Sequence, residues 1–398
     1  MSNGNKTSCR DVYIMGGLRS PIGVYRGQYK TTPPEVLGAA VIDALLERTG
    51  YTTVDRVYCG NAVAGGGNIG RLTALLSSLP ETVPAVTVDM QCASAGGALE
   101  WAYSGIRAGL YDTVLAGGTE SSSLQPLRTY GDDDYREGSY RVAQFSPQER
   151  DELAMLKGAE RTMQKYRVRA DELTPWILRS HQCAVLAEKE GHLQSYKLNG
   201  EEMKRRIALV SESYSIPQPI LTHVPVDECI RPRMSERLLQ RMPSLLGPNT
   251  LTTAGNACLT HDGAAFLLLG TQPSRYRIAA VTAWAGNPLY SPEGAMEATE
   301  QLLTQTGLTM AAIDAVEWNE AFAVIDVLFG RRYEAYTERY NRCGGALAYG
   351  HPYGASGAII VLHLMASLEC CGGRYGLAAI AGAGGVGTAM LIERMITK

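Results

Sequence analysis

Several patterns that would point to a metal, a disulfide framework or a polyanionic partner are missing from this 398-residue sequence. Its nine cysteines are scattered, with no C-x-x-C pair and an odd total, which argues against a disulfide framework or a zinc site. The six histidines form no H-x-x-x-H set, so we expect no metal. The 37 basic and 40 acidic residues give a net charge of −3, so neither nucleic acid nor a membrane surface is an expected partner.

Long apolar runs are also missing. Residues 1–10 contain no apolar core of signal-peptide length, and no later run reaches the ~20 apolar residues of a membrane span. We therefore expect a cytoplasmic protein that does not cross a membrane. A chain of 398 residues is too long for one ordinary core, which predicts two domains or one duplicated architecture.

Residues 86–101 are the most informative stretch. Val86 and Val88 alternate as in a strand, small residues follow, and a helical period continues through Leu99. Cys92 therefore lies where a strand passes into a helix. The positive end of the helix dipole and the free N–H groups there favour a thiolate, which makes Cys92 a candidate nucleophile. Taken alone, a lone cysteine in an apolar segment is more often a buried structural residue than a nucleophile.

Strand-like and helix-like segments alternate on both sides of this stretch. Residues 11–17 and 55–60 read as strands and residues 34–48 as a helix, which indicates a parallel sheet with crossover helices. Residues 121–244 differ, because they combine two charged helical runs with an irregular, proline-containing part. We interpret 121–244 as an insertion carried by the first domain.

The second half repeats the first in outline. Residues 92–120 and 354–385 both contain a small-residue helix start, a helix, a strand and a glycine pair, in that order. Two such copies would bring both helix starts to one crevice at the strand ends. Cys92 would then meet Asn319 and His351 of the other half. His351 lies in a stiff Gly-His-Pro loop, and an imidazole beside a thiol is what base-assisted thiolate formation requires.

A dinucleotide-binding fold is a rival on motif grounds. Residues 65–70 satisfy G-x-G-x-x-G, and Asp89 lies near the distance expected for a ribose-binding acid. However, a turn separates the motif from its strand, and the unit does not begin at the first strand of the chain. A second match at 382–387 is followed by a strand-like segment that leaves no room for a βαβ unit.

Ordered blocks along nearly the whole chain resemble the thiolase family, which comprises acetyl-CoA acetyltransferases and 3-ketoacyl-CoA thiolases. The blocks that carry this resemblance are Arg19-Ser-Pro-Ile-Gly, Gln91-Cys-Ala-Ser, Ala116-Gly-Gly-Thr-Glu, Asp227-Glu-Cys-Ile-Arg-Pro, Thr253-Ala-Gly-Asn-Ala, Asp262-Gly-Ala-Ala, Asn319-Glu-Ala-Phe-Ala, Gly350-His-Pro-Tyr-Gly-Ala-Ser-Gly and residues 375–387.

The resemblance implies an α/β protein with a five-layer αβαβα fold of two similar halves and an inserted loop domain. The expected boundaries are 1–120 plus 245–275 for the N-terminal half, 121–244 for a loop domain that binds coenzyme A (CoA), and 276–398 for the C-terminal half. It further implies a homodimer or homotetramer that uses acyl-CoA and CoA as substrates, with no permanently bound cofactor.

The resemblance also assigns residues. Cys92 would be the acylated nucleophile, His351 its activator, and Asn319 with His351 the oxyanion site for the thioester enolate. The residues expected to bind CoA are Arg231 at its nucleotide end, Met155 and Phe322 along the pantetheine tunnel, and Cys258.

The sequence departs from the family pattern at several of these places. Ala381 stands where thiolases carry a second reactive cysteine, which acts as a general acid and base. The other departures are Ala154 for a histidine, Cys258 for a serine, Ala383 for a glycine and Cys343 for an asparagine. Losing a positioned acid or base typically costs ~10²–10⁴-fold in rate, whereas acylation of Cys92 does not require that group.

Three interpretations follow. The first is a thiolase-type acyltransferase with its own substitute for the missing acid. The second is a relative that transfers the acyl group from Cys92 to another acceptor, or hydrolyses it. The third is a non-catalytic CoA-binding subunit.

Overall fold

The computed structural model describes residues 9–147, 150–217, 221, 223–258 and 260–395. Strands and helices alternate in the first half of the chain, as its sequence predicts. The elements of this half are β1 (Val12–Arg19), β2 (Gly23–Val24), α1 (Pro34–Thr49), β3 (Arg56–Gly60), α2 (Ile69–Leu76), β4 (Ala85–Val88), α3 (Ser94–Arg107), β5 (Thr113–Ser121) and β8 (His261–Gly270).

The second half has the same alternation. Its strands and helices are β9 (Tyr276–Ala285), α8 (Gly294–Thr306), β10 (Ala315–Trp318), α9 (Ala323–Arg332), α10 (Ala346–Tyr349), α11 (Tyr353–Cys371), β11 (Tyr375–Gly382) and β12 (Val386–Arg394), with short 3-10 turns at Pro288–Glu293, Met310–Ala312 and Glu334–Arg339.

The strand order confirms the internal repeat. The first half has the order β4-β3-β5-β8-β1 and the second β10-β11-β12-β9, and β1 pairs with β9 where the halves meet. Equivalent neighbours run in the same directions: β3 and β5 are parallel, as are β10 and β11, whereas β8 and β12 run antiparallel to both of their neighbours. The sheet is therefore mixed rather than parallel, because the final strand of each half reverses direction.

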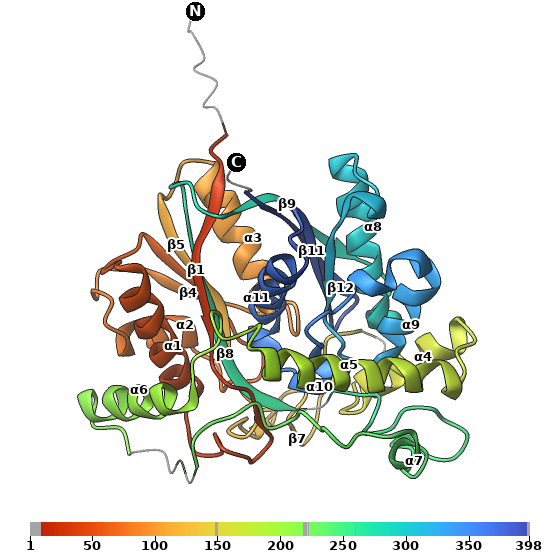
Figure 1. Ribbon diagram of the computed structural model, residues 1–398. Helices are drawn as coiled ribbons and strands as arrows, with labels where there is room; N and C mark the ends of the chain where they lie inside the picture. Colours follow the sequence, from red (N-terminus) through yellow and green to blue (C-terminus); the bar gives the residue numbers. More distant parts are fainter. Residues whose placement is uncertain (1–8, 148–149, 218–220, 222, 259, 396–398) are drawn as a thin grey trace, which may run out of the picture.

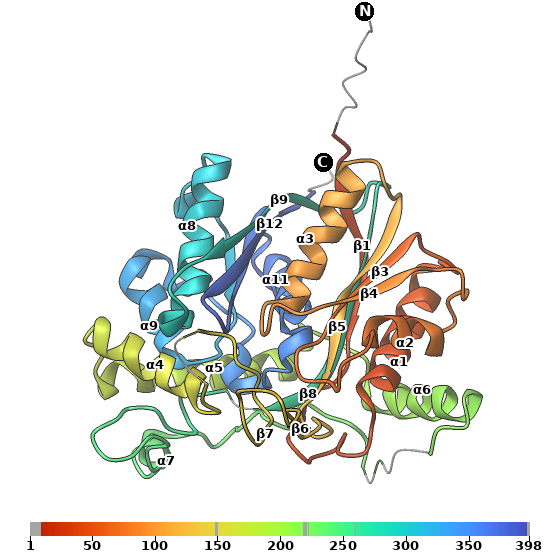
Figure 2. The same cartoon turned by 180° about the vertical axis from the view of Figure 1, so that it is seen from behind.

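Five layers are visible in Figures 1 and 2. Helices α1 and α2 cover the first set of strands, α8 and α9 cover the second, and α3 and α11 lie between the two sets. Helix α11 is long and apolar enough to cross a membrane by length and composition, but 83% of that window is buried inside the protein. Its apolar surface therefore forms the core that the two halves share.

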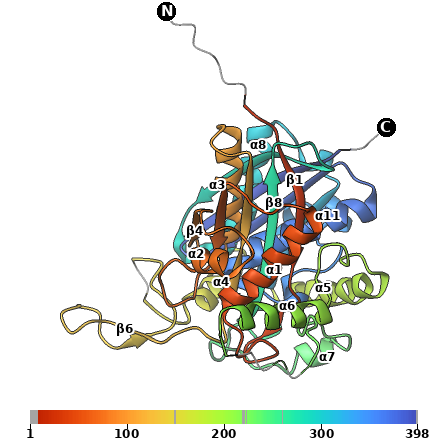
Figure 3. The same cartoon turned by 90° about the vertical axis from the view of Figure 1, so that its left-hand side faces the viewer.

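Residues 121–244 leave the sheet and form β6 (Arg128–Thr129), β7 (Ser139–Tyr140), α4 (Ala154–Lys165), α5 (Ala170–Glu190), α6 (Gly200–Ser213) and α7 (Glu236–Leu239). In Figure 3 the segment around β6 projects from the body of the molecule. The sequence predicts only two helical runs before an irregular part, and this is wrong at α6. Asn199 caps that helix by accepting the Glu202 N–H, and Met203 and Ile207 are buried. The domain boundaries given above stay a prediction.

Candidate active site

Cys92 lies in a tight turn between β4 and α3. The residue before it, Gln91, has a φ of +54°, a left-handed conformation that is uncommon for a non-glycine residue. Two side chains hold the turn. Asp89 accepts the Gln91 backbone N–H at 2.8 Å, and the Ser94 hydroxyl accepts the Met90 N–H at 2.9 Å. The turn thus fixes Cys92 at the start of α3, where the sequence predicts it.

The Cys92 sulfur lies against backbone N–H groups but is hardly reached by solvent. Burial raises the pKa of Cys92 to about 12, although its own N–H and that of Ala383 act in the opposite direction. The expectation of a resting thiolate is therefore wrong, because desolvation of the sulfur outweighs the hydrogen bonds. Cys92 is a neutral thiol that needs a base.

His351 occupies the loop between α10 and α11 and is 1% exposed. Its Nδ1 lies 2.6 Å from the Ser356 hydroxyl oxygen, and that hydroxyl donates to the Pro352 carbonyl at 2.9 Å. Because a hydroxyl has one proton, Ser356 accepts from Nδ1–H, which leaves Nε2 as the basic nitrogen. Burial and the nearby His261 lower the pKa of His351 to about 3, so the ring is neutral.

Asn319 follows the end of β10 and is 1% exposed. Its backbone N–H donates to the Ala379 carbonyl at 3.0 Å, which holds the residue against β11. Its side-chain nitrogen lies 3.4 Å from Nε2 and 3.5 Å from Nδ1 of His351. The structure therefore brings together the asparagine and the histidine that the sequence singles out.

Cys92 and His351 line one cavity of about 210 Å³, which also receives Met155, Cys258 and Phe322. These residues come from the first half, the second half and the inserted segment. The remaining wall is formed by Ala62, Val63, Gln91, Gln125, Arg128, Arg141, Val142, Ala143, Phe145, Glu152, Leu156, Thr260, Ala321, Tyr353 and Ala383. The cavity is thus a crevice between the two halves that the inserted segment covers.

Arg231 lies outside this cavity. It is exposed, its guanidinium donates to the Glu228 carbonyl, and it lines a neighbouring cavity of about 240 Å³. Cys258 belongs to the walls of both cavities. The cavity of Cys92 and the cavity of Arg231 therefore meet at Cys258.

Glu120, at the end of β5, ties the two halves together beside the site. Its carboxylate accepts the backbone N–H groups of Ala62 and Gly354, both at 2.9 Å, and the side-chain amide of Asn61 at 2.9 Å. Burial raises the pKa of Glu120 to about 7. The sequence alone predicted no role for Glu120; the available signal was an acidic residue two positions after the glycine pair of a buried strand.

Tyr353 was also missed. It is the first residue of α11 and lines the Cys92 cavity, and its ring meets the His351 ring edge to face, with 5.0 Å between centroids. The available signal was its place in the Gly350–Gly354 loop, two positions after His351.

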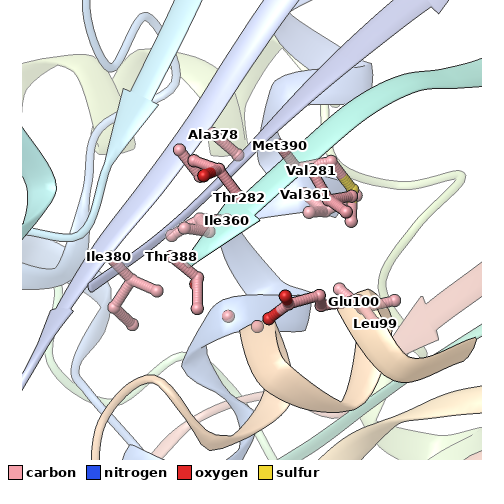
Figure 4. Close-up of a pocket in the computed structure, with 13 residues that line it drawn as sticks. Leu99, Glu100, Val281, Thr282, Ile360, Val361, Ala378, Ile380, Thr388 and Met390 are labelled. Atoms are coloured by element: carbon pink, nitrogen blue, oxygen red, sulfur yellow. The ribbon is translucent and has the colours of Figure 1, made fainter. Parts of the chain in front are cut away.

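Another cavity lies between α3, α11 and the strands β9 and β12. It is lined by Glu100, Thr282 and Thr388 among others (Figure 4) and measures about 10 Å³. That volume holds about one water molecule, so it is no substrate site. Within the described part of the chain, no three His, Cys, Asp or Glu side chains are grouped so as to hold a metal ion.

Two family models match consecutive parts of the chain. The model for the thiolase N-terminal domain matches residues 12–272, and that for the thiolase C-terminal domain matches residues 273–394. The chain belongs to the thiolase family. It is an acyltransferase of that family, and the expected α/β fold of two similar halves is confirmed.

Individual relatives agree with this assignment. The chain is 31% identical to the steroid 3-ketoacyl-CoA thiolase FadA6 of Mycobacterium tuberculosis, over 99% of this chain and 96% of that protein. It is 33% identical to the acetyl-CoA acetyltransferase of a Synechocystis species, over 97% and 100%. The crystal structure of the Bacillus anthracis acetyl-CoA acetyltransferase superimposes with a TM-score of 0.87 at 25% identity, covering 98% of this chain and all of the other.

Proposed function

We propose that this thiolase is an acyl-CoA C-acyltransferase that carries the acyl group on Cys92 as a thioester. The observation that supports this most directly is one cavity that contains the buried Cys92 thiol, Ala383 and the neutral His351, where the N–H groups of Cys92 and Ala383 act to lower the pKa of the thiol. As the sulfur attacks the acyl carbonyl, His351 takes its proton. The two N–H groups then stabilise the oxyanion, the usual way in which such groups lower the barrier of acyl transfer.

The other predicted residues bind coenzyme A or stabilise the enolate of the thioester. Asn319 and His351 stabilise the thioester enolate, Met155 and Phe322 line the path of the pantetheine arm, and Cys258 and Arg231 extend that path towards the nucleotide. The donor and acceptor are CoA thioesters and CoA, so no permanently bound cofactor is needed. We keep a homodimer or homotetramer as the expected assembly and the cytoplasm as the expected location.

The test is the intact mass of the full chain after mixing with acetyl-CoA. We expect one acetyl adduct in the wild type and none in Cys92→Ala, with Cys343→Ala as the matched buried-cysteine control that retains the adduct. Absence of the adduct would overturn the proposal and favour a CoA-binding subunit without catalysis.

Thiolysis of acetoacetyl-CoA then distinguishes the two catalytic alternatives. A wild type that forms the adduct and consumes acetoacetyl-CoA with CoA is a C-acyltransferase. An adduct without thiolysis, decaying to free acetate, indicates a thioesterase or a transferase with another acceptor.

A further inference from the structure

We propose that the phenol of Tyr353 is the proton donor and acceptor for the carbon–carbon step of this enzyme. The inference rests on the acyl transfer through Cys92 proposed above. That chemistry releases a carbanion at the α-carbon of a thioester, and the carbanion must receive a proton. In this cycle the proton on His351 is the one that Cys92 recovers when it leaves the acyl group, and Ala381 has none to give.

The position of Tyr353 fits this task. It lines the cavity that contains Cys92 and His351, and its ring contacts the His351 ring at 5.0 Å between centroids. Its hydroxyl makes no hydrogen bond to any residue that the structure describes, so both its proton and its lone pairs are free for a substrate. Because Tyr353 is the first residue of α11, the helix fixes its backbone beside the active-site loop.

Most other polar groups in the cavity wall are unsuited to carry a proton at neutral pH. Amides and guanidinium groups do not ionise there, a threonine hydroxyl is a very weak acid, and the one carboxylate is exposed and accepts the Arg141 N–H at 2.9 Å. The residues in question are Gln91, Gln125, Arg128, Arg141, Glu152 and Thr260.

Cys258 is the strongest rival. Its thiol is engaged, however, since it donates to the Ala346 carbonyl at 3.0 Å and lies 3.9 Å from Nδ1 of His261. Cys258 also lines the neighbouring cavity that contains Arg231. Tyr353 therefore remains the group with an uncommitted proton that contacts His351 and shares the cavity with Cys92.

The protons balance over the cycle. Cys92 attacks the 3-keto carbon of a 3-ketoacyl-CoA and gives its proton to His351. The C2–C3 bond breaks, and the acetyl-CoA carbanion takes the Tyr353 proton, leaving acyl-Cys92, an imidazolium and a phenolate. CoA then gives its thiol proton to the phenolate and attacks the acyl group, and the departing Cys92 thiolate recovers its proton from His351.

The acid strength of the phenol suits both transfers. Burial raises the pKa of Tyr353 above its usual range, and the charge that Cys92 can carry raises it further. The phenol is therefore protonated when the carbanion forms. Once formed, the phenolate is a stronger base than a thiolate, so it readily takes the proton of CoA.

The experiment compares wild type, Tyr353→Phe and Cys258→Ser in three measurements: the acetyl adduct on Cys92, thiolysis of acetoacetyl-CoA, and exchange of the acetyl-CoA methyl protons in D₂O. Adduct formation needs only Cys92 and His351. We therefore expect Tyr353→Phe to keep it, while thiolysis and deuterium exchange both fall by about 100-fold or more. Cys258→Ser, at a wall residue of the CoA path, should change the KM for CoA at most and keep the kcat of thiolysis and the exchange rate, whereas Tyr353→Phe should lower both of these.

The outcomes separate the two proposals. If the wild type forms no adduct, the proposed function itself fails. If the wild type forms the adduct but Tyr353→Phe keeps its thiolysis and exchange, or if Cys258→Ser loses them instead, the role of Tyr353 is refuted. A wild type that is acylated without any thiolysis or exchange also refutes it, because no proton then reaches carbon. Retention of the adduct by Tyr353→Phe shows that the variant is folded.

Discussion

Helices α3 and α11 meet at two glycines: a Cβ atom on Gly357 would lie 2.3 Å from the backbone nitrogen of Gly96. A second close approach lies one turn earlier on α11, where a Cβ on Gly354 would lie 2.6 Å from the Asn61 Cα. Cys92 lies two residues before the first residue of α3, and His351 lies two residues before the first residue of α11. The crossing of the two helices is therefore what brings the thiol and the imidazole into one cavity.

This crossing predicts that Gly357→Ala destabilises the protein. The added methyl group would overlap backbone atoms that cannot rotate away, and overpacking of a core typically costs about 1–3 kcal/mol. Urea unfolding of the full chain measures the loss.

Gly158→Ala in α4 is the matched control, because its Cβ would meet its nearest neighbour, the Leu289 carbonyl oxygen, at an ordinary 3.6 Å. That variant should be neutral or more stable by up to about 1 kcal/mol, since alanine favours a helix. Equal unfolding free energies for the two variants would contradict the close approach of α3 and α11.

The neutral His351 predicts how acylation depends on pH. Its pKa is lowered to about 3, so the ring can accept a proton at every pH above that value. The rate at which acetyl-CoA forms the Cys92 adduct should therefore not fall between about pH 8 and about pH 5, where an ordinary histidine would become protonated. Rapid quenching followed by intact mass measures this rate.

Titration of Glu120 could produce a pH dependence like that of an ordinary histidine, because the pKa of Glu120 is raised to about 7. The profile should accordingly be repeated with Glu120→Gln, which removes that titration. A fall with a midpoint near the ordinary histidine pKa in both proteins would show that His351 is less shielded than the structure indicates.

The buried ion pair of Arg19 and Asp227 predicts a large stability effect. Both side chains are at most 1% exposed, with contacts of 2.8 and 3.1 Å, and Lys197 lies 3.1 Å from the same carboxylate. Asp227→Asn leaves the guanidinium without its partner and should cost about 3–5 kcal/mol. Asp112→Asn, at an exposed ion pair with Arg10, should cost less than about 1 kcal/mol.

The same ion pair predicts that the protein becomes less stable as the pH falls. The two cations hold the pKa of Asp227 well below its usual range. Its stabilisation is therefore complete above the unfolded value of about 3.9 and is lost as the pH falls below it. Urea midpoints that stay constant through this range in the wild type, or that fall equally in Asp227→Asn, would contradict this account.

The sequence determined the elements because their signals are local. The predicted strand at 11–17 is β1 (Val12–Arg19), the helix at 34–48 is α1 (Pro34–Thr49), and the repeat of 92–120 in 354–385 reappears as α3–β5 and α11–β11. Periodicity reports which face of a segment is apolar, and the recurrence of small residues at helix starts marks where two backbones must approach closely. Both can be read without coordinates.

Only the tertiary structure decided whether Cys92 is charged and which residues line the cavity around it. The sequence places Cys92 at a helix start and therefore predicts a thiolate, but the charge on a group depends on how much water its neighbours exclude, and these come from three distant segments. For the same reason the local sequence around Glu120 and Tyr353 did not show that both residues lie beside Cys92 and His351. Their importance comes from a helix crossing and a shared crevice, which exist once the two halves have packed together.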